Sequence, residues 1–143
     1  FDFKLFFDLL CPEGGVMAQE SGDARAKGRE LAGRLFRGLP PSRAVHADLM
    51  AHTIDHLFGD VWQDERLTLQ QRSLVTCTVL VATGREAEQY LHFRGARNLG
   101  IDRSTLEAMI THVAHYAGWP VAVSASRVLG EVWEQMDEQE KSS

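Results

Sequence analysis

The chain has 143 residues, with 20 Asp and Glu against 15 Lys and Arg and a formal net charge of -5. An acidic chain without a block of basic residues is not expected to bind nucleic acid. Its length suffices for one hydrophobic core, and its two cysteines are too few for a disulfide scaffold. No uninterrupted apolar run is long enough to cross a membrane. The composition therefore predicts a cytoplasmic protein with a single globular domain.

The first 22 residues are predicted to be an N-terminal extension, and residues 23–143 a single domain. Residues 1–10 hold four of the seven phenylalanines, but they also hold charged residues and lack the features of a signal peptide. Two interpretations stay open. Either Met17 is the natural start and residues 1–16 come from upstream translation or an expression vector, or this segment docks on a partner subunit.

The spacing of apolar residues predicts helices separated by short loops. Two helices open with a capping box, formed by Thr68 with Gln71 and by Ser104 with Glu107, and the last has Pro120 in its first turn. No stretch alternates with the two-residue period of a strand over a useful length, so we expect a compact all-α fold of about six helices. The predicted helices span residues 23–37, 42–58, 69–83, 85–99, 104–117 and 120–139, and the tail beyond them is expected to fray.

The predicted helix 69–83 is apolar on nearly every side. A helix of this kind usually lies at the centre of a bundle or of an oligomer. Cys77 stands in its middle, with no neighbouring positive charge and no partner cysteine. We therefore expect the Cys77 thiol to have a raised pKa and to be inert.

The helix 85–99 carries a carboxylate and an imidazole one turn apart. Its apolar stripe is expected at Leu91, Gly95 and Leu99, with Glu88 inside that arc and His92 on its edge. A partly desolvated Glu–His pair is a common way to tune an acid or base toward neutral pH. The alternative interpretation is a buried ion pair that only fixes the packing of the helices.

Other histidines also occur on predicted helices. His112 is expected beside the core stripe of helix 104–117 and His115 on the opposite face. In a monomer His115 would be solvated, whereas in an oligomer either residue could belong to a site at a subunit boundary. His52 and His56 have the i,i+4 spacing of metal ligands, but no third ligand is indicated, so we predict no metal site.

Three segments carry a family resemblance: the R-S-L-V-T helix from Arg72, the G-R-E…L-H…N-x-G segment from Gly84, and the T-H-V-A-x-Y-A-G-W-P turn from Thr111. Residues 67–133, preceded by F-G-D-V-W at 58–62, resemble the carboxymuconolactone decarboxylase family, within the alkylhydroperoxidase-D-like fold. The resemblance implies a compact all-α subunit that assembles into a ring, as a homotrimer or homohexamer, with sites between subunits.

The resemblance also implies an activity, the cofactor-free decarboxylation of a carboxylated muconolactone to an enol-lactone in aromatic catabolism. By position, Glu88, His92 and His112 are its candidate catalytic residues, and His115 stands where the family more often has an aromatic or aliphatic residue. Family members with redox activity carry a CxxC motif before a histidine. This chain has only Cys77 in that region, so the thiol chemistry of that branch is not indicated.

This decarboxylation needs no metal or cofactor as an electron sink, because the substrate can accept the electrons itself. When a butenolide ring carbon loses CO2, the electrons delocalise onto the lactone carbonyl, so the protein must stabilise an oxyanion and supply a proton to carbon. We assign the proton to His92, supported by Glu88, and the oxyanion or a second proton transfer to His112. The residues that could bind a substrate carboxylate, unless they lie on a solvated face, are Arg85, Arg94 and Arg97.

Two other functions fit the same fold. A peroxide-reducing thiol enzyme would depend on a reactive Cys77 with a low pKa. A non-catalytic oligomeric binding protein would use the Glu88–His92 pair for packing alone.

Overall fold

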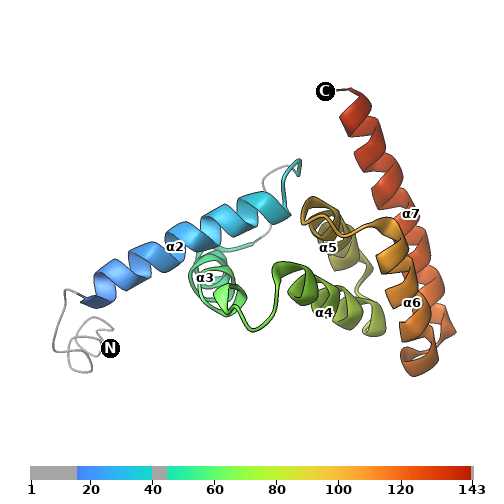
Figure 1. Cartoon of the computed structure of the whole chain (residues 1–143), viewed down its shortest axis with the longest axis horizontal. Coiled ribbons are helices and arrows are strands. Elements are labelled where there is room, and N and C mark those ends of the chain that lie inside the picture. The colour runs from blue at the N-terminus through green and yellow to red at the C-terminus, as the bar shows by residue number, and fades with distance from the viewer. Residues whose placement is uncertain (1–15, 40–44, 143) are drawn as a thin grey trace. The chain divides into compact units, whose positions relative to one another are not determined.

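The computed structural model describes residues 16–39 and 45–142, with residues 16–21 described by their backbone alone. All regular structure in these ranges is helical, which confirms the all-α prediction of about six helices. The α-helices are α2 (Val16–Leu35), α3 (Ala47–His52), α4 (Leu69–Ala82), α5 (Glu86–Asn98), α6 (Arg103–Ala117) and α7 (Trp119–Lys141) (Figure 1). A π-helix, η1 (Thr53–Phe58), and a short 3-10 helix, η2 (Val61–Gln63), follow α3. No helix in the described part of the chain is long and apolar enough to span a membrane.

The predicted N-terminal extension is described only in part. Helix α2 begins at Val16 and runs through the predicted boundary at residue 23, while the phenylalanine-rich residues 1–10 lie outside the described residues. The described residues fall into two compact units. The first contains residues up to 31 together with 45–63, and the second contains the rest.

In the first unit, helix α2 packs closely against η1. A Cβ atom on Gly28 would lie 1.9 Å from a carbonyl oxygen of η1, and one on Gly59 would lie 2.2 Å from a carbonyl oxygen of α2, so both positions need glycine. Arg25 donates two hydrogen bonds of 2.8 Å to the Asp55 carboxylate across this contact. The single α-helix predicted over 42–58 is wrong in its second half, where this close packing accompanies the wider turn of a π-helix.

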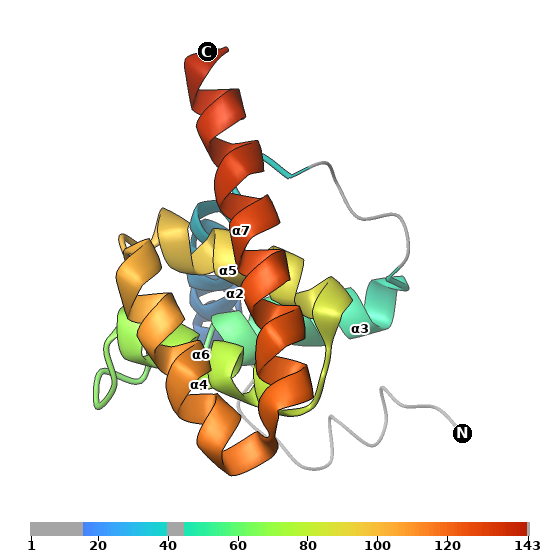
Figure 2. The same cartoon turned by 90° about the vertical axis from the view of Figure 1, so that its right-hand side faces the viewer.

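The second unit is built around α4, which packs against α5, α6 and α7. Helices α6 and α7 form a hairpin and lie side by side, and α5 packs against α4 and α7 (Figure 2). Apolar side chains from all four helices fill the core, among them Cys77, Val81, Phe93, Leu106, Ile110, Ala125, Leu129 and Val132.

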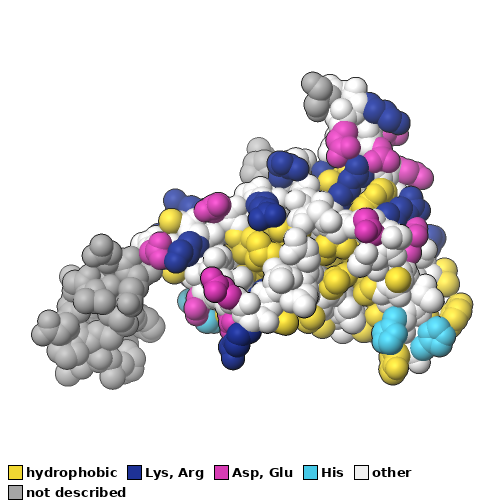
Figure 3. Space-filling view, in the orientation of Figure 1, with side chains coloured by type: hydrophobic (Ala, Val, Ile, Leu, Met, Phe, Trp, Pro, Cys, Tyr) yellow, Lys and Arg dark blue, Asp and Glu magenta, His cyan; other side chains and the backbone are white. Residues whose placement is uncertain are grey.

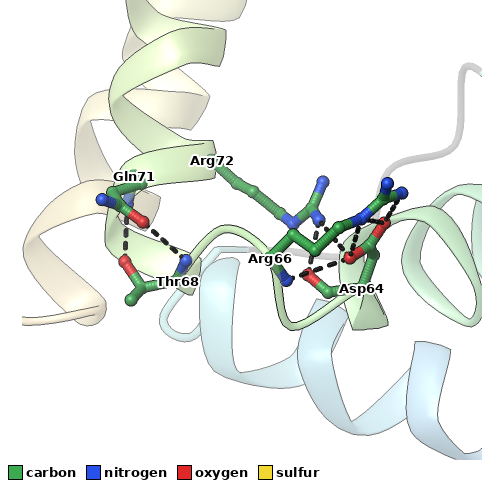
Figure 4. Close-up of polar contacts among 5 residues, drawn as sticks. All are labelled: Asp64, Arg66, Thr68, Gln71 and Arg72. Atoms are coloured by element: carbon green, nitrogen blue, oxygen red, sulfur yellow. Dashed lines mark hydrogen bonds and ion pairs between the residues drawn. The ribbon is translucent and has the colours of Figure 1, made fainter.

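The start of α4 follows the sequence prediction. The Gln71 backbone N–H donates to the Thr68 hydroxyl at 3.1 Å, and the Thr68 N–H donates to the Gln71 side-chain oxygen at 2.8 Å (Figure 4). This confirms the first predicted capping box. Just before it, Arg66 pairs with the Asp64 carboxylate, which lowers the pKa of Asp64, and Arg72 donates to the Asp64 carbonyl at 2.5 Å. These contacts fix the loop that leads into α4.

The apolar surface of α4 is only partly covered within one chain. Cys77 and Val81 face the core and are fully buried, whereas Val75 and Val79 are 57% and 55% exposed. The prediction that this helix lies at the centre of a bundle is confirmed for its inner face. Its outer face presents apolar side chains at the surface.

The second predicted capping box is wrong. Asp102, rather than Ser104, caps α6, and its carboxylate accepts the Thr105 backbone N–H at 2.7 Å. Ser104 donates its hydroxyl proton to the same carboxylate, and Glu107 pairs with Arg103 instead of the cap. An ionised aspartate is the stronger acceptor at a helix N-terminus, so α6 starts two residues earlier than a Ser104 cap allows.

Helix α7 has Pro120 in its first turn, as predicted, but does not fray at its predicted end. It continues to Lys141 because its last turns are tied to α5. Arg94 and Arg97 of α5 donate hydrogen bonds to Gln139 and Glu140 at 2.8 and 3.0 Å.

Candidate functional site

The buried face of α5 differs from the predicted stripe. Phe93 is fully buried at its centre. Gln89 lies one turn before it, 1% exposed, and donates its side-chain N–H to the Leu80 carbonyl at 3.1 Å. Glu88, predicted to lie inside the buried arc, is exposed. The prediction is wrong here because the aromatic ring of Phe93 and the hydrogen-bonded amide of Gln89 fix the rotation of the helix.

His92 is partly buried on the flank of that face. Its ring meets the Phe36 ring edge-on, with centroids 5.9 Å apart. Desolvation lowers the pKa of His92, and the charge of Glu88, one turn away, opposes that shift without cancelling it. No hydrogen bond or ion pair between these two side chains occurs among the described residues. Glu88 therefore acts on His92 through its field rather than by contact, and the imidazole is mainly neutral at pH 7.

The thiol of Cys77 is unsuited to catalysis. The side chain is completely buried, and burial raises its pKa to about 12. The thiol is directed to the backbone carbonyl of His92, with a sulfur–oxygen distance of 3.7 Å. This confirms the predicted inert thiol. A thiol-based peroxidase would need a reactive thiolate, which Cys77 does not provide.

The three candidate arginines do not gather around His92. Arg85 is the exposed N-cap residue of α5. Arg94 lies two residues after His92, about 200° around the helix, and faces the end of α7. Arg97 lies on that side as well, where it pairs with Asp137 and stacks on Trp133. The solvated-face alternative is wrong for Arg94 and Arg97, because α7 covers both.

The histidines of α6 form a separate group. The exposed rings of His112 and His115 lie 4.8 Å from Tyr116 and 5.6 Å from Trp119, respectively, between ring centroids. The Nδ1 atom of His115 is 2.9 Å from the carbonyl oxygen of Thr111. Figure 3 shows histidine side chains beside hydrophobic ones at the end where α6 meets α7. No contact among the described residues joins these rings to His92.

The predicted HxxxH pair lies in the first unit. His56 is exposed and its Nδ1 atom is 3.4 Å from an Asp60 oxygen. Within the described ranges, no three or more His, Cys, Asp or Glu side chains are grouped so as to hold a metal ion.

Sequence reasoning missed a polar strip between α5 and α7. The Tyr90 hydroxyl donates to the Glu131 carboxylate, and the Ser124 hydroxyl donates to that of Glu86. The only local signal was the i,i+4 spacing of Glu86 and Tyr90, which places them on one face. Their partners on α7 lie about forty residues away and cannot be read from that spacing.

Comparison with known proteins decides the family. A sequence model described as the carboxymuconolactone decarboxylase family matches residues 47–131, a range that includes every candidate site residue. The chain belongs to the carboxymuconolactone decarboxylase family. This confirms the resemblance inferred from the R-S-L-V-T, L-H and Y-A-G-W-P segments.

Within the carboxymuconolactone decarboxylase family, the chain is 38% identical over 79 residues to a 4-carboxymuconolactone decarboxylase of Acinetobacter baylyi, covering 55% of this chain and 59% of that one. It is 35% identical over 68 residues to a nitrosuccinic acid decarboxylase of Metarhizium robertsii, covering 48% of each. It is also 35% identical over 65 residues to peroxisomal protein 2 of Saccharomyces cerevisiae, covering 45% of this chain and 23% of that protein. The chain thus spans about half the length of the two decarboxylases it matches.

Proposed function

We propose that this chain is a carboxy-lyase that removes CO2, without a cofactor, from a small carboxylated lactone of the 4-carboxymuconolactone type. The observation that carries the proposal is the similarity to two proteins that are both named decarboxylases of small acids. The family model matches residues 47–131, which contain α5 and α6. The Cys77 thiol, with its raised pKa, favours this reaction over peroxide reduction.

His92 is the proposed proton donor. Loss of CO2 from the ring carbon leaves a dienolate whose charge rests on the lactone carbonyl oxygen, and one proton must then reach carbon. A partly buried imidazole can hold that proton when protonated and recover it from solvent. Glu88, one turn earlier, favours the protonated form through its charge. Aimed hydrogen-bond donors near the carbonyl oxygen would stabilise the dienolate.

The site is proposed to be completed by a second copy of the chain. In one chain, His92, the pair Arg94 and Arg97, and the α6 histidines do not come together. Tyr116 and Trp119, which flank the α6 histidines, are 81% and 61% exposed. Exposed aromatic side chains of this kind are common at subunit boundaries. In a homotrimer or homohexamer, His112 or His115 of one copy would then lie in the same site as His92 of the neighbouring copy.

The test is CO2 release from 4-carboxymuconolactone by the purified chain with no added cofactor. His92→Ala is expected to lower kcat/KM by roughly 10²- to 10⁴-fold, the usual contribution of a general acid. His56→Ala is the matched control, because His56 is exposed and lies in the other unit. Absence of turnover would contradict the proposal and favour a non-catalytic binding protein, whereas dependence on Cys77 would favour thiol chemistry.

A further inference from the structure

The Arg94 guanidinium is buried and has no carboxylate partner in the part of the chain that the structure describes. It is 5% exposed and is the one buried charged residue among those the structure describes. Its Nη1 atom donates to the Gln139 side-chain oxygen at 2.8 Å, and no ion pair to Arg94 occurs within the described ranges. A guanidinium has five N–H donors, and burying its charge without an anion is unfavourable. Burial, with the nearby charge of Arg97, lowers the pKa of Arg94.

The acidic side chains nearby are already engaged. Arg97, one turn further along α5, pairs with Asp137 at 2.7 Å and with Glu140 at 3.0 Å. It also donates to the Trp133 carbonyl at 3.2 Å. Arg94 and Arg97 are three residues apart, yet among the described residues Arg97 has two counterions and Arg94 has none. Among the described residues, Arg94 therefore keeps the neutral Gln139 amide as its hydrogen-bond acceptor and gains no carboxylate.

A pocket lies in front of Arg94. It has a volume of about 300 Å³, and its walls include Arg37, Arg94, Met136, Gln139 and Glu140. This volume is at the lower end of the range of small-molecule sites. All the walls come from one unit of the chain.

Two features keep the pocket open toward the guanidinium. Gly38 has φ of 83°, and a Cβ atom there would lie 3.2 Å from the Arg94 Nη1 atom. The Asn98 side chain donates to the carbonyl oxygens of Leu35 and Arg37 at 2.9 and 3.4 Å, which fixes the turn that carries Arg37 and Gly38. The pocket wall is thus held in place by α5, and a second arginine stands at its edge.

We infer that this pocket binds a small monocarboxylate with an apolar body, at a site distinct from His92. The planar fork of Arg94 matches a carboxylate, and Met136 provides an apolar wall. Glu140 lines the same pocket and carries a negative charge, which disfavours a dianionic phosphate. Because Arg94 and His92 face opposite sides of α5, the site is separate from the proposed proton donor.

The probes are benzoate, its uncharged analogue benzamide, and inorganic phosphate, titrated into the full chain by calorimetry at constant ionic strength. Benzoate is expected to bind saturably and benzamide not to bind, because the charge-assisted fork needs a carboxylate. Phosphate is expected to bind at least about tenfold more weakly than benzoate, because the Glu140 charge repels a dianion. Equal binding of phosphate and benzoate, or absence of benzoate binding, would overturn the inference.

Variants locate the site. Arg94→Met should weaken benzoate binding by at least about tenfold. Arg103→Met removes the same charge from an exposed position on α6 and should leave benzoate binding unchanged. Gln139→Glu places a carboxylate where Arg94 already has its acceptor, so it should abolish benzoate binding and raise Tm. This second variant keeps the test decisive if Arg94→Met fails to fold. Unchanged benzoate binding in Gln139→Glu, or a wild-type Arg94 paired with an acid of a second copy, would contradict the inference.

Discussion

The imidazole of His92 is partly desolvated, and this determines its protonation. Its pKa lies below the ordinary 6.5 because burial disfavours the charged ring, and the Glu88 charge moves it back only in part. If imidazolium is the proton donor, kcat/KM falls as pH rises through this lowered pKa. The active fraction is therefore largest in mildly acidic solution.

Glu88→Gln tests whether the carboxylate tunes His92. Removing the charge lowers the pKa of His92 further, so the falling limb of the pH–kcat/KM profile should move to lower pH. Glu134→Gln on the exposed surface of α7 is the matched control and should leave the profile in place. A limb that does not move in Glu88→Gln would show that Glu88 has no part in the protonation of His92.

Cys77 gives a second test at the level of single residues. Its pKa of about 12 means that almost no thiolate exists at pH 8. In a Cys11→Ser background, where Cys77 is the remaining thiol, a thiol reagent should not label the native protein and should label it fully in denaturant. Rapid labelling of the native protein would contradict the buried position.

At the level of secondary structure, the N-terminus of α6 can be tested for which residue caps it. In the structure the cap is Asp102, whereas the sequence predicted a capping box of Ser104 and Glu107. Asp102→Ala should lower the free energy of unfolding by about 1 kcal/mol, the usual value of an N-cap. Glu107→Gln removes only an exposed ion pair with Arg103, so it should change that free energy by less than about 0.5 kcal/mol. Urea unfolding measures both, and a larger effect of Glu107→Gln would favour the capping box read from the sequence.

Helix α5 organises the second unit because each of its faces has a different partner. One face packs Phe93 into the core, a second brings His92 to Phe36, and a third directs Arg94 and Arg97 to the end of α7. The local sequence predicts the helix and its ends to within one residue. The rotation of the helix depends on α4 and α7, which is why the predicted buried arc was wrong at Glu88.

For the whole molecule, the exposed apolar face of α4 bears on assembly. We expect light scattering to report a trimer or hexamer, with Val79 among the covered residues. Val79→Lys should shift the protein to a smaller species without loss of helicity, because a buried lysine charge is costly. Ala108→Lys on exposed α6 is the control. A monomeric wild type would contradict the expected ring.

The sequence by itself determined the helices, the Thr68–Gln71 cap and the family, because these depend on residues close together in the chain. The spacing of apolar residues, the capping residues and the glycines that end helices are local properties of the sequence. The segments that identify the family are visible in the sequence itself. It did not determine the π-helix at η1, the Asp102 cap, or which arginine has a counterion.

Only the tertiary structure decided what surrounds each functional side chain. Arg94 and Gln139 are 45 residues apart, and Arg97 and Glu140 are 43 apart, so no spacing rule relates them. The packing of α7 on α5 gives Arg97 its carboxylates and leaves Arg94 with a neutral amide. Because water hardly reaches the Arg94 guanidinium, its charge needs a counterion. The described residues do not supply one.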